Sequence, residues 1–325
     1  MGNYFVTGCA GFIGAYVVKR LLADGHSVVG VDNLNDAYDP RLKDWRLGRL
    51  GQRENFVFEK VDIVDLDPLR TAWGDRKYDG VINLAARAGV RPSVRMPGVY
   101  YETNLLGALN LLELAKEHSV PKFVQASTSS LYGLNNPRPY REDADTSQPL
   151  SPYAASKGAV ESLCHSYSHL HGMDISVLRY FTVYGPAGRP DMSIFRFVQW
   201  IAEGRPLILY GDGEQERDFT FVEDIAHGTV AALRPMGYEV INLGGDRPVK
   251  INTLIKMIEA RLGKEAVIEQ HAPAPGDMPA TWADIRKAHE LLDWQPQMNL
   301  EQGLDLTVAW YLQERDWAQT VVTAD

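Results

Sequence analysis

Residues 3–14, with the sequence NYFVTGCAGFIG, constrain the fold of this chain more than any other stretch. The apolar run at 4–6 predicts a buried strand, Gly8, Gly11 and Gly14 mark a tight turn, and the pattern of 12–23 predicts a helix. Glycine lets a backbone approach a diphosphate closely, and free N–H groups at a helix N-terminus attract anions. The stretch therefore predicts a strand, a turn and a helix that together hold a phosphate group.

A second predicted strand, residues 27–31, ends on Asp32. A carboxylate about twenty residues beyond such a glycine turn suits hydrogen bonding to a ribose diol and repels a 2′-phosphate. The pair of features therefore favours NAD over NADP. The alternative is an ordinary strand–helix–strand turn that is followed by an aspartate by chance.

Strand and helix patterns alternate from residue 1 to about 130, which predicts a parallel sheet with helices on both faces. Beyond residue 185 glycine and proline become denser and the alternation stops. We expect a doubly wound α/β fold with a second, smaller mixed α/β domain. The first domain would comprise 1–185, with 218–244 returning to it, and the second would comprise 186–217 and 245–325. Further elements are predicted as strands at 55–61, 81–85, 122–126 and 175–180, and as helices at 100–118 and 153–171.

Composition narrows the class of protein. A net charge of −9 argues against a nucleic-acid partner. No run approaches the roughly 18 apolar residues that a membrane span needs, and no signal peptide is recognisable, so we expect no membrane contact. Two cysteines, Cys9 and Cys164, cannot form a disulfide framework and fit the reducing cytoplasm.

The segment YAASK, from Tyr153 to Lys157, opens a predicted helix and carries candidate chemistry. Its tyrosine and lysine lie four residues apart and therefore on one face. A free phenol titrates at about 10, and a fixed ammonium beside it, together with a positively charged nicotinamide ring, favours the phenolate. We therefore expect the pKa of Tyr153 to be lowered, which would make it a general base at neutral pH. Thr128, at the end of a predicted strand, can donate to the same substrate oxygen. The alternative is an ordinary helix pair.

Several motifs recur in one known superfamily: TGCAGFIG, DNL at Asp32, NLAA at Asn83, YAASK, and RDFTFVEDIA at Arg217. Over nearly its whole length the chain resembles the extended short-chain dehydrogenase/reductase superfamily, which has a Rossmann fold. Within it the chain is most similar to the UDP-glucuronate 4-epimerases. That likeness rests on DNLNDAYDPRLKDWRL, ARAGVRPSVRMPGVYYETNLLGALNLLE, YSHLHG and RYFTVYGPAGRPDM.

The resemblance implies a reaction and a cofactor. Such enzymes oxidise carbon 4 of a UDP-sugar with bound NAD, rotate the 4-keto intermediate and reduce its opposite face. Tyr153 would be the base, Lys157 its electrostatic partner and the anchor of the nicotinamide ribose, and Thr128 a hydrogen-bonding assistant. The implied NAD-binding residues are Gly8, Gly11, Phe12, Ile13, Gly14, Asp32, Asn33, Asp62, Ile63, Ala85, Tyr153 and Lys157.

The resemblance also implies how the UDP-sugar is held. Arg217 matches the arginine that meets the UDP phosphates, and Asp277 matches a carboxylate near the nucleotide ribose. The donors suited to a uronate carboxylate are Ser129, Ser130, Thr182 and Arg189. An alternative for Arg189 is a solvated loop charge.

Related enzymes differ at identifiable positions. Sugar-nucleotide 4,6-dehydratases carry Asp-Glu where this chain has Ser129 and Ser130, and uronate decarboxylases keep a glutamate at the second of these places. A UDP-hexose 4-epimerase stays open as an alternative, although Ala274 and Thr281 replace an arginine and a bulky tyrosine that many of those enzymes carry.

Two departures from the family pattern lie on the loop expected beneath the cofactor. Asn83 replaces a usual histidine and Arg87 a usual glutamine, and their roles are open.

A non-catalytic, NAD-sensing protein is a second alternative, although such proteins typically lose the tyrosine or the lysine. The family likeness implies a homodimer through helices 100–118 and 153–171. We expect no metal ion.

Overall fold

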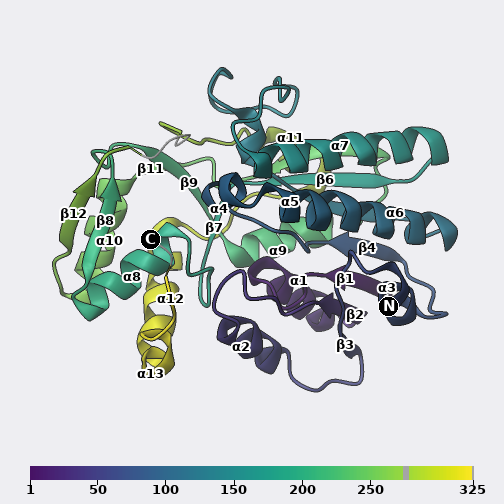
Figure 1. Cartoon of the computed structure of the whole chain (residues 1–325), viewed down its shortest axis with the longest axis horizontal. Helices are drawn as coiled ribbons and strands as arrows, with labels where there is room; N and C mark the ends of the chain where they lie inside the picture. The colour runs from purple at the N-terminus through teal and green to yellow at the C-terminus, as the bar shows by residue number, and fades with distance from the viewer. Residues whose placement is uncertain (274–277, 324–325) are drawn as a thin grey trace.

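The computed structural model describes residues 1–273 and 278–323. In this part of the chain seven parallel strands form the main sheet, in the order β10-β6-β5-β4-β1-β2-β3 (Figure 1). The strands are β1 (Asn3–Thr7), β2 (Ser27–Asp32), β3 (Phe56–Lys60), β4 (Gly80–Asn83), β5 (Phe123–Thr128), β6 (Ile175–Tyr180) and β10 (Tyr238–Leu243). The order reverses between β1 and β4, and doubly wound sheets bind ligands at the C-terminal strand ends beside such a reversal. The predicted fold class is confirmed.

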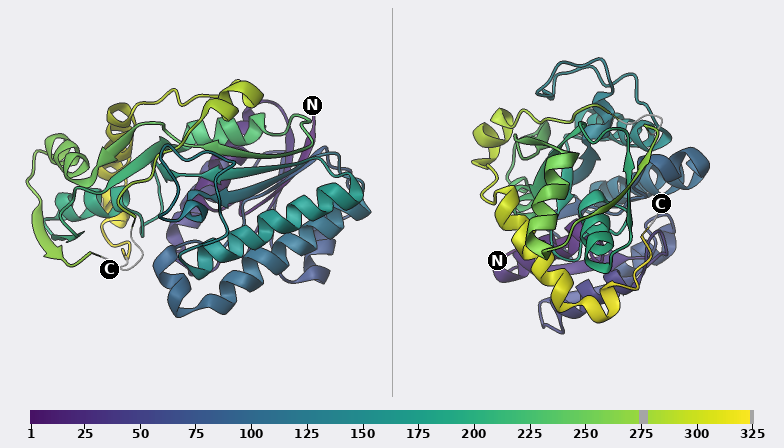
Figure 2. Two further views of the ribbon diagram at one scale, coloured as in Figure 1. Left: turned by 90° about the horizontal axis from the view of Figure 1, so that it is seen from above. Right: turned by 90° about the vertical axis from the view of Figure 1, so that its left-hand side faces the viewer.

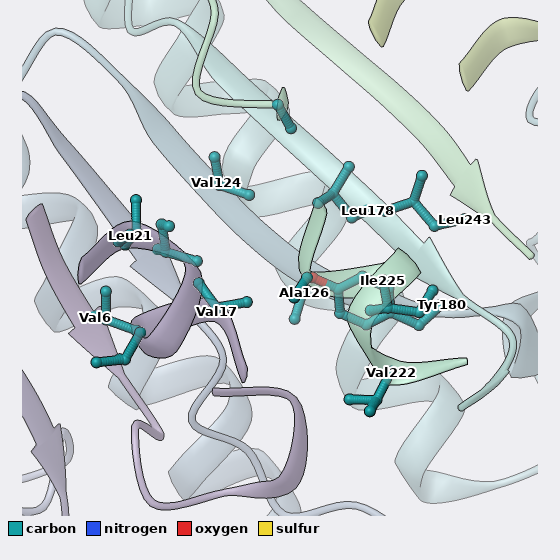
Figure 3. Close-up of a cluster of buried hydrophobic side chains, with 14 of the residues drawn as sticks. Val6, Val17, Leu21, Val124, Ala126, Leu178, Tyr180, Val222, Ile225 and Leu243 are labelled. Atoms are coloured by element: carbon teal, nitrogen blue, oxygen red, sulfur yellow. The ribbon is translucent and has the colours of Figure 1, made fainter. Parts of the chain in front are cut away.

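Helices cover both faces of this sheet. They are α1 (Phe12–Ala23), α2 (Arg41–Leu50), α3 (Leu66–Trp73), α4 (Val90–Arg95), α5 (Pro97–Tyr100), α6 (Gly107–Glu117), α7 (Pro152–His171), α9 (Val222–Ala231) and α11 (Arg286–Leu292). Neighbouring strand residues point to opposite faces. Val6 and Val124 accordingly pack against α1 and α9 (Figure 3), whereas Phe5 and Phe123 pack on the face of α3, α6 and α7. The helices α6 and α7 lie side by side along that second face (Figure 2).

The prediction of one α-helix over 100–118 is wrong in its first third. After α5 comes a π-helical segment, η1 (Tyr101–Leu106), and only then α6. Within η1 the buried Asn104 accepts from the backbone N–H of Arg87 at 2.8 Å and donates to its carbonyl at 3.0 Å. Segments of π-helix are rare and frequently accompany functional sites. Here the segment ties the helix to the loop after β4.

A smaller α/β unit adjoins the C-terminal edge of the main sheet (Figure 1). Its strands are β7 (Thr182–Tyr184), β8 (Pro206–Tyr210), β9 (Glu216–Phe221), β11 (Pro248–Lys250) and β12 (Val267–His271), and its helices are α8 (Ser193–Glu203), α10 (Ile251–Leu262), α12 (Leu300–Gln313) and α13 (Arg315–Ala318). The strands form one sheet of order β11-β9-β7 and one pair, β12-β8. Strand β7 ends before residue 185 but pairs with β9 of this unit. The smaller unit therefore begins a few residues before the domain boundary expected at 185.

Helix α2 lies between the two units. Its Leu50 belongs to the core of the main sheet, whereas its Leu42 belongs to the core of the smaller unit. Nowhere in residues 1–273 and 278–323 is a helix long and apolar enough to cross a membrane.

Candidate active site

The glycine turn is shaped by contacts that exclude side chains. Gly8 has a φ of 67°, and a Cβ there would lie 2.7 Å from the backbone nitrogen of Ala85. A Cβ on Gly14 would lie 2.0 Å from the carbonyl oxygen of Gly8. Gly11 is the N-cap of α1 and supplies no side chain to the first N–H groups of the helix. Those groups stay available to an anion, so the turn fits a dinucleotide diphosphate.

The other residues assigned to NAD lie at the C-terminal ends of β1 to β4. Asp32 ends β2, and its Oδ1 accepts from the backbone N–H of Leu34 at 2.8 Å and from Lys43 Nζ at 3.2 Å. Asn33 Nδ2 donates to Asp62 Oδ2 at 2.7 Å. Ile63 is buried, and the backbone N–H of Ala85 donates to Thr7 at 3.1 Å. These strand ends, at the switch point of the sheet, are suited to an adenosine moiety.

Lys43 is a site residue that the sequence analysis missed. It lies on α2, eleven positions beyond Asp32, and its side chain is 6% exposed. The one available signal was that it falls within the same motif as Asp32. Since the recorded contacts of Asp32 use Oδ1, Oδ2 of this carboxylate has no hydrogen-bond partner among the described residues and is free to meet a ribose hydroxyl.

Thr128 and Tyr153 meet at the centre of the site. Thr128 is the last residue of β5, and Tyr153 is the second residue of α7. The helix begins there because Ser151 caps it, accepting from the backbone N–H of Ala154 at 3.2 Å, and because Pro152 occupies its first turn. The side chain of Thr128 acts on the phenol of Tyr153 and favours a lower pKa for it. The oxygen of Thr128 also contacts Ser130 Oγ at 3.2 Å. Ser129, beside it, is buried.

In the protein alone, without the nicotinamide charge that the prediction includes, the pKa of Tyr153 is raised. Burial raises the pKa of Tyr153, and this effect outweighs the hydrogen bond from Thr128 and the charge of Arg189, which both lower it. Lys157 Nζ instead donates to the carbonyl of Ala126 at 3.0 Å, and burial lowers the pKa of Lys157 to about 8. Sequence spacing predicted the shared helix face but not the burial or the competing backbone acceptor.

A buried network below these residues holds β5 against α7. Ser127 donates to Glu161 Oε1 at 2.5 Å, and Arg179 contacts both carboxylate oxygens, at 3.0 and 2.7 Å. Arg179 also donates to the hydroxyl of Tyr132 at 3.0 Å. Ser127 precedes Thr128 and Glu161 follows Lys157 by one turn, so the network fixes the strand end that carries Thr128 relative to the helix that carries Tyr153. Nothing in the sequence alone distinguished these residues.

Arg189 lies in the segment after β7, close to Tyr153. Its Nε and Nη2 donate to the two carboxylate oxygens of Asp191 at 3.0 and 2.5 Å, and Nη2 also donates to the carbonyl of Ala88 at 3.4 Å. Burial alone would raise the pKa of Asp191, but the charge and hydrogen bonds of Arg189 hold it below its usual value. Arg189 is therefore a paired and partly buried cation and not a solvated loop charge. Its positive charge favours a lower pKa for the phenols of Tyr100 and Tyr153, although burial raises both pKa values by more.

The remaining predicted residues are distributed around this cluster. Thr182 begins β7 and is partly buried. Arg217 lies on β9, where Nη1 donates to the carbonyl of Met278 at 2.8 Å. Asp277 and Ala274 lie outside the described residues. Asn83 is buried at the end of β4, not in the loop as expected, and donates to Gln125 at 2.8 Å while accepting from Thr7 at 2.6 Å.

Arg87 lies in the loop after β4, as expected. Its backbone is bound by Asn104, and its charge lowers the pKa of Tyr100 by less than burial raises it. The ring of Tyr100 contacts that of Tyr153 with centroids 6.1 Å apart. Arg87 thus adds positive charge on the same side of the site as Arg189.

Comparisons with known proteins find related enzymes over almost the whole chain. The family model described as GDP-mannose 4,6 dehydratase matches residues 5–307. A UDP-glucuronate 4-epimerase of Thermodesulfobacterium geofontis is 54% identical over 311 residues, which cover 95% of this chain and 96% of that protein. The structure of a UDP-glucuronic acid 4-epimerase from Bacillus cereus, in complex with UDP-glucuronic acid and NAD, is similar with a TM-score of 0.89 and 38% identity, covering 96% of this chain and 99% of the other.

A UDP-glucose 4-epimerase of Thermotoga maritima, solved with UDP-glucose, has a TM-score of 0.88 and 32% identity, with 96% and 99% of the two chains covered. The glycine turn, the strand-end aspartate, the Thr128–Tyr153 contact and these matches over almost the whole length lead to one assignment. The chain belongs to the extended short-chain dehydrogenase/reductase superfamily, in the group of NAD-dependent sugar-nucleotide enzymes that includes the UDP-glucuronate 4-epimerases.

Proposed function

We propose that this chain is a UDP-glucuronate 4-epimerase that interconverts UDP-glucuronate and UDP-galacturonate with tightly bound NAD. The observation that carries the proposal is the position of Arg189, a partly buried cation that is paired with Asp191 and whose positive charge favours a lower pKa of Tyr153, as the side chain of Thr128 does. A base for a sugar hydroxyl and a cation for a carboxylate are thereby close together. The relatives that match most of the chain, named as UDP-glucuronate 4-epimerases, support the same reaction.

The residues divide the work as follows. NAD, when bound, accepts a hydride from carbon 4 of the sugar and returns it to the opposite face. Tyr153 takes the proton of the 4-hydroxyl and later gives it back, and Thr128 holds the same oxygen. Because burial raises the pKa of Tyr153, the phenolate depends on neighbouring positive charge. Arg189 supplies part of it, and a positively charged nicotinamide ring would add to it when bound.

The polar side chains after Thr128 suit an epimerase. Acid–base work at carbons 5 and 6 needs carboxyl groups, and Ser129 and Ser130 cannot do it. Neutral hydroxyls can instead donate to a uronate carboxylate. With Thr182 and Arg189 they would form a clamp that holds the carboxylate while carbon 4 is a ketone. The clamp matters because a ketone β to a carboxylate makes loss of carbon dioxide easy.

A second candidate is a UDP-hexose 4-epimerase. The specific observation in its favour is the Thermotoga maritima enzyme, whose TM-score of 0.88 is close to the 0.89 of the uronate enzyme. The fold alone therefore does not separate the two substrates. The carboxylate-binding side chains do, which makes substrate preference the decisive measurement.

The test is to incubate the purified protein with UDP-glucuronate and, separately, with UDP-galactose, and to separate the products by chromatography. We expect UDP-galacturonate to form from the first without added NAD and without net reduction of the cofactor. A preference for UDP-galactose would favour the second candidate. Absence of turnover with either, despite bound NAD, would favour an NAD-sensing protein.

The same proposal extends to organisation and compartment. We propose an NAD domain of 1–185 and 218–244 and a UDP-sugar domain of 186–217 and 245–325. Strand β7 and most of β9 fall within the numbered limits of the NAD domain, although they pair in the sheet of the smaller unit. A homodimer through the helices at 100–118 and α7 is supported by apolar side chains exposed on them: Tyr101, Leu106 and Leu170 at 40%, 41% and 70%. Sedimentation analysis tests it. Two buried free cysteines suit the cytoplasm.

A further inference from the structure

Arg46, on α2, is a buried cation that the reaction does not use. It is 2% exposed and ranks among the largest fully buried side chains. No carboxylate of the described residues lies within ion-pair distance of its guanidinium, and its recorded hydrogen bonds go to neutral oxygens only. A buried charge normally has an opposite charge beside it. The rings of Phe12 and Tyr38, with centroids 5.7 and 5.4 Å from its Cζ, also face the guanidinium, but they carry no net negative charge. Arg46 therefore requires an explanation.

The hydrogen bonds of Arg46 connect two segments that are far apart in the sequence. Nη1 donates to the carbonyl of Ala10, inside the glycine turn, at 3.2 Å. Nε and Nη2 donate to the carbonyl of Ala187 at 3.1 and 2.7 Å, and Nη2 reaches the carbonyl of Gly188 at 3.3 Å. The remaining bond goes to the hydroxyl of Tyr38 at 2.6 Å. One side chain thus joins the glycine turn to the residues that immediately precede Arg189.

The segment that Arg46 holds does not keep this shape by local preference. Ala187 has a φ of 53°, a left-handed conformation that a residue with a Cβ adopts rarely. Its carbonyl receives two of the bonds from Arg46, and Tyr16 on α1 donates to the neighbouring carbonyl of Pro186 at 3.1 Å. The strained conformation is therefore maintained from outside, by side chains of the helices that border the cofactor crevice.

We propose that Arg46 is a positioning residue that couples the two ligand sites: it fixes the loop of Arg189 against the glycine turn, and its charge is balanced by the diphosphate of the dinucleotide bound there. The uronate part of this inference rests on the proposed function, and the cofactor part does not. Removing Arg46 should then both loosen NAD and misplace the side chain that meets the substrate carboxylate. A change that keeps the positive charge of Arg46 but removes its planar guanidinium should impair only the contact with the substrate carboxylate.

The test compares Arg46→Met, which loses charge and donors, with Arg46→Lys, which keeps the charge but cannot bridge both segments. Arg49→Gln is the matched control, because Arg49 lies on the same helix and its side chain is 62% exposed. NAD affinity is measured by titrating cofactor-stripped protein, and kcat/KM is measured with UDP-glucuronate and UDP-glucose at saturating NAD. Circular dichroism verifies that each variant is folded.

We expect Arg46→Met to weaken NAD binding tenfold or more, and Arg46→Lys to stay within threefold of the unmodified protein. Both should lower kcat/KM for UDP-glucuronate at least fivefold more than for UDP-glucose. Equal losses for both sugars, or NAD affinity within twofold in Arg46→Met, would overturn the inference. If Arg46→Met does not fold, an unchanged sugar preference in Arg46→Lys overturns it instead. Should the unmodified protein lack a uronate preference, the proposed function fails, while the NAD comparison still decides the cofactor part.

Discussion

The glycine turn at residues 8–14 and the loop at 185–191 are neighbouring segments joined by Arg46, and they are built in opposite ways. In the first, Gly8 takes a φ of 67° without a steric penalty. In the second, Ala187 takes a φ of 53° with a Cβ present, a conformation that costs about 1 to 2 kcal/mol. The turn is specified by its own residues. The loop depends on Arg46, Tyr16 and Asp191, which bind it from outside or orient its arginine.

This difference separates what is general in such a protein from what is specific. A diphosphate needs free N–H groups and close backbone approach, which glycine supplies locally. A uronate carboxylate needs a cation held at one angle, and an arginine reaches that angle only when its other donors are occupied. We call the part of the site around the glycine turn the cofactor half and the part around the loop at 185–191 the substrate half. The cofactor half can therefore be damaged by adding one methyl group. The substrate half can be damaged by removing one polar contact.

The largest effect is expected from Gly14→Ala. The new Cβ would lie 2.0 Å from the carbonyl oxygen of Gly8, a backbone atom that cannot yield without breaking the turn. We expect a loss of about 3 kcal/mol or more in the free energy of unfolding and no retained NAD. Thermal unfolding and the absorbance of released cofactor measure both.

Gly48→Ala is the matched control for that change. A Cβ on Gly48, within α2, meets nothing within 4 Å, so the substitution should stabilise the protein by up to about 1 kcal/mol. If Gly14→Ala and Gly48→Ala behaved alike, the turn would not be sterically closed as described.

Tyr153→Phe should harm chemistry while leaving both halves intact. The ring remains, but the group that exchanges a proton with the sugar is lost, so kcat should fall by about 10²- to 10⁴-fold. NAD retention and the ratio of kcat/KM for UDP-glucuronate to that for UDP-glucose should stay unchanged. Near-normal turnover in steady-state assays would remove Tyr153 from the mechanism.

Arg189→Ala should affect the substrate half selectively. A charge-assisted contact is worth roughly 1.5 to 3 kcal/mol, which corresponds to about 10- to 150-fold in kcat/KM for UDP-glucuronate. UDP-galactose, which has no carboxylate, should be affected little. A loosened clamp should also release some decarboxylated product, which mass spectrometry detects. Escape of the 4-keto UDP-pentose leaves NADH on the protein, whereas UDP-pentose forms when NADH returns its hydride to that ketone. Thr182→Val should act in the same direction more weakly. Equal losses for both sugars without such products would mean that the carboxylate is held elsewhere.

The two halves also differ in how far the sequence predicts them. The strand ends that carry Asp32 and Thr128, and the helix start at Tyr153, follow from apolar runs, glycine and serine caps, because those signals act over a few residues. The contacts of Lys43, Arg46 and Glu161 depend on which segments meet after folding. Burial, which raises the pKa of Tyr153 in the protein alone, is likewise a property of the assembled site and not of the spacing between Tyr153 and Lys157.

Asp32→Ser tests the cofactor half by charge and not by shape. Its carboxylate repels a 2′-phosphate and also pairs with Lys43 Nζ at 3.2 Å. Removing it should weaken NAD by about tenfold, the value of one charge-assisted contact of roughly 1.5 kcal/mol. The freed ammonium of Lys43 should at the same time improve binding of NADP. Titrations with both cofactors measure the change in preference. If the unmodified protein bound NAD and NADP equally, Asp32 would not reach the ribose.

The smallest effect concerns pH and a buried carboxyl of the three-stranded sheet. Asp218, on β9, is fully buried and accepts from the backbone N–H groups of Gly245, Asp246 and Ala283 at 2.6, 3.2 and 2.9 Å. Burial raises its pKa to about 6 despite these bonds. The native state therefore binds this proton more tightly than the unfolded chain does, and the carboxyl stabilises the fold as pH falls through about 6 toward 3.8.

Between pH 7 and pH 5 this carboxyl should add about 1 kcal/mol to the free energy of unfolding, and Asp218→Asn should lack that increment. Urea unfolding of both proteins at several pH values isolates it, because every other titrating group is common to the two. Gly48→Ala serves again as the control and should follow the unmodified protein at each pH. A difference between Asp218→Asn and the unmodified protein that stays constant from pH 7 to 5 would mean that Asp218 is ionised throughout. The hydrogen bonds from the backbone N–H groups would then outweigh burial in setting the pKa of Asp218.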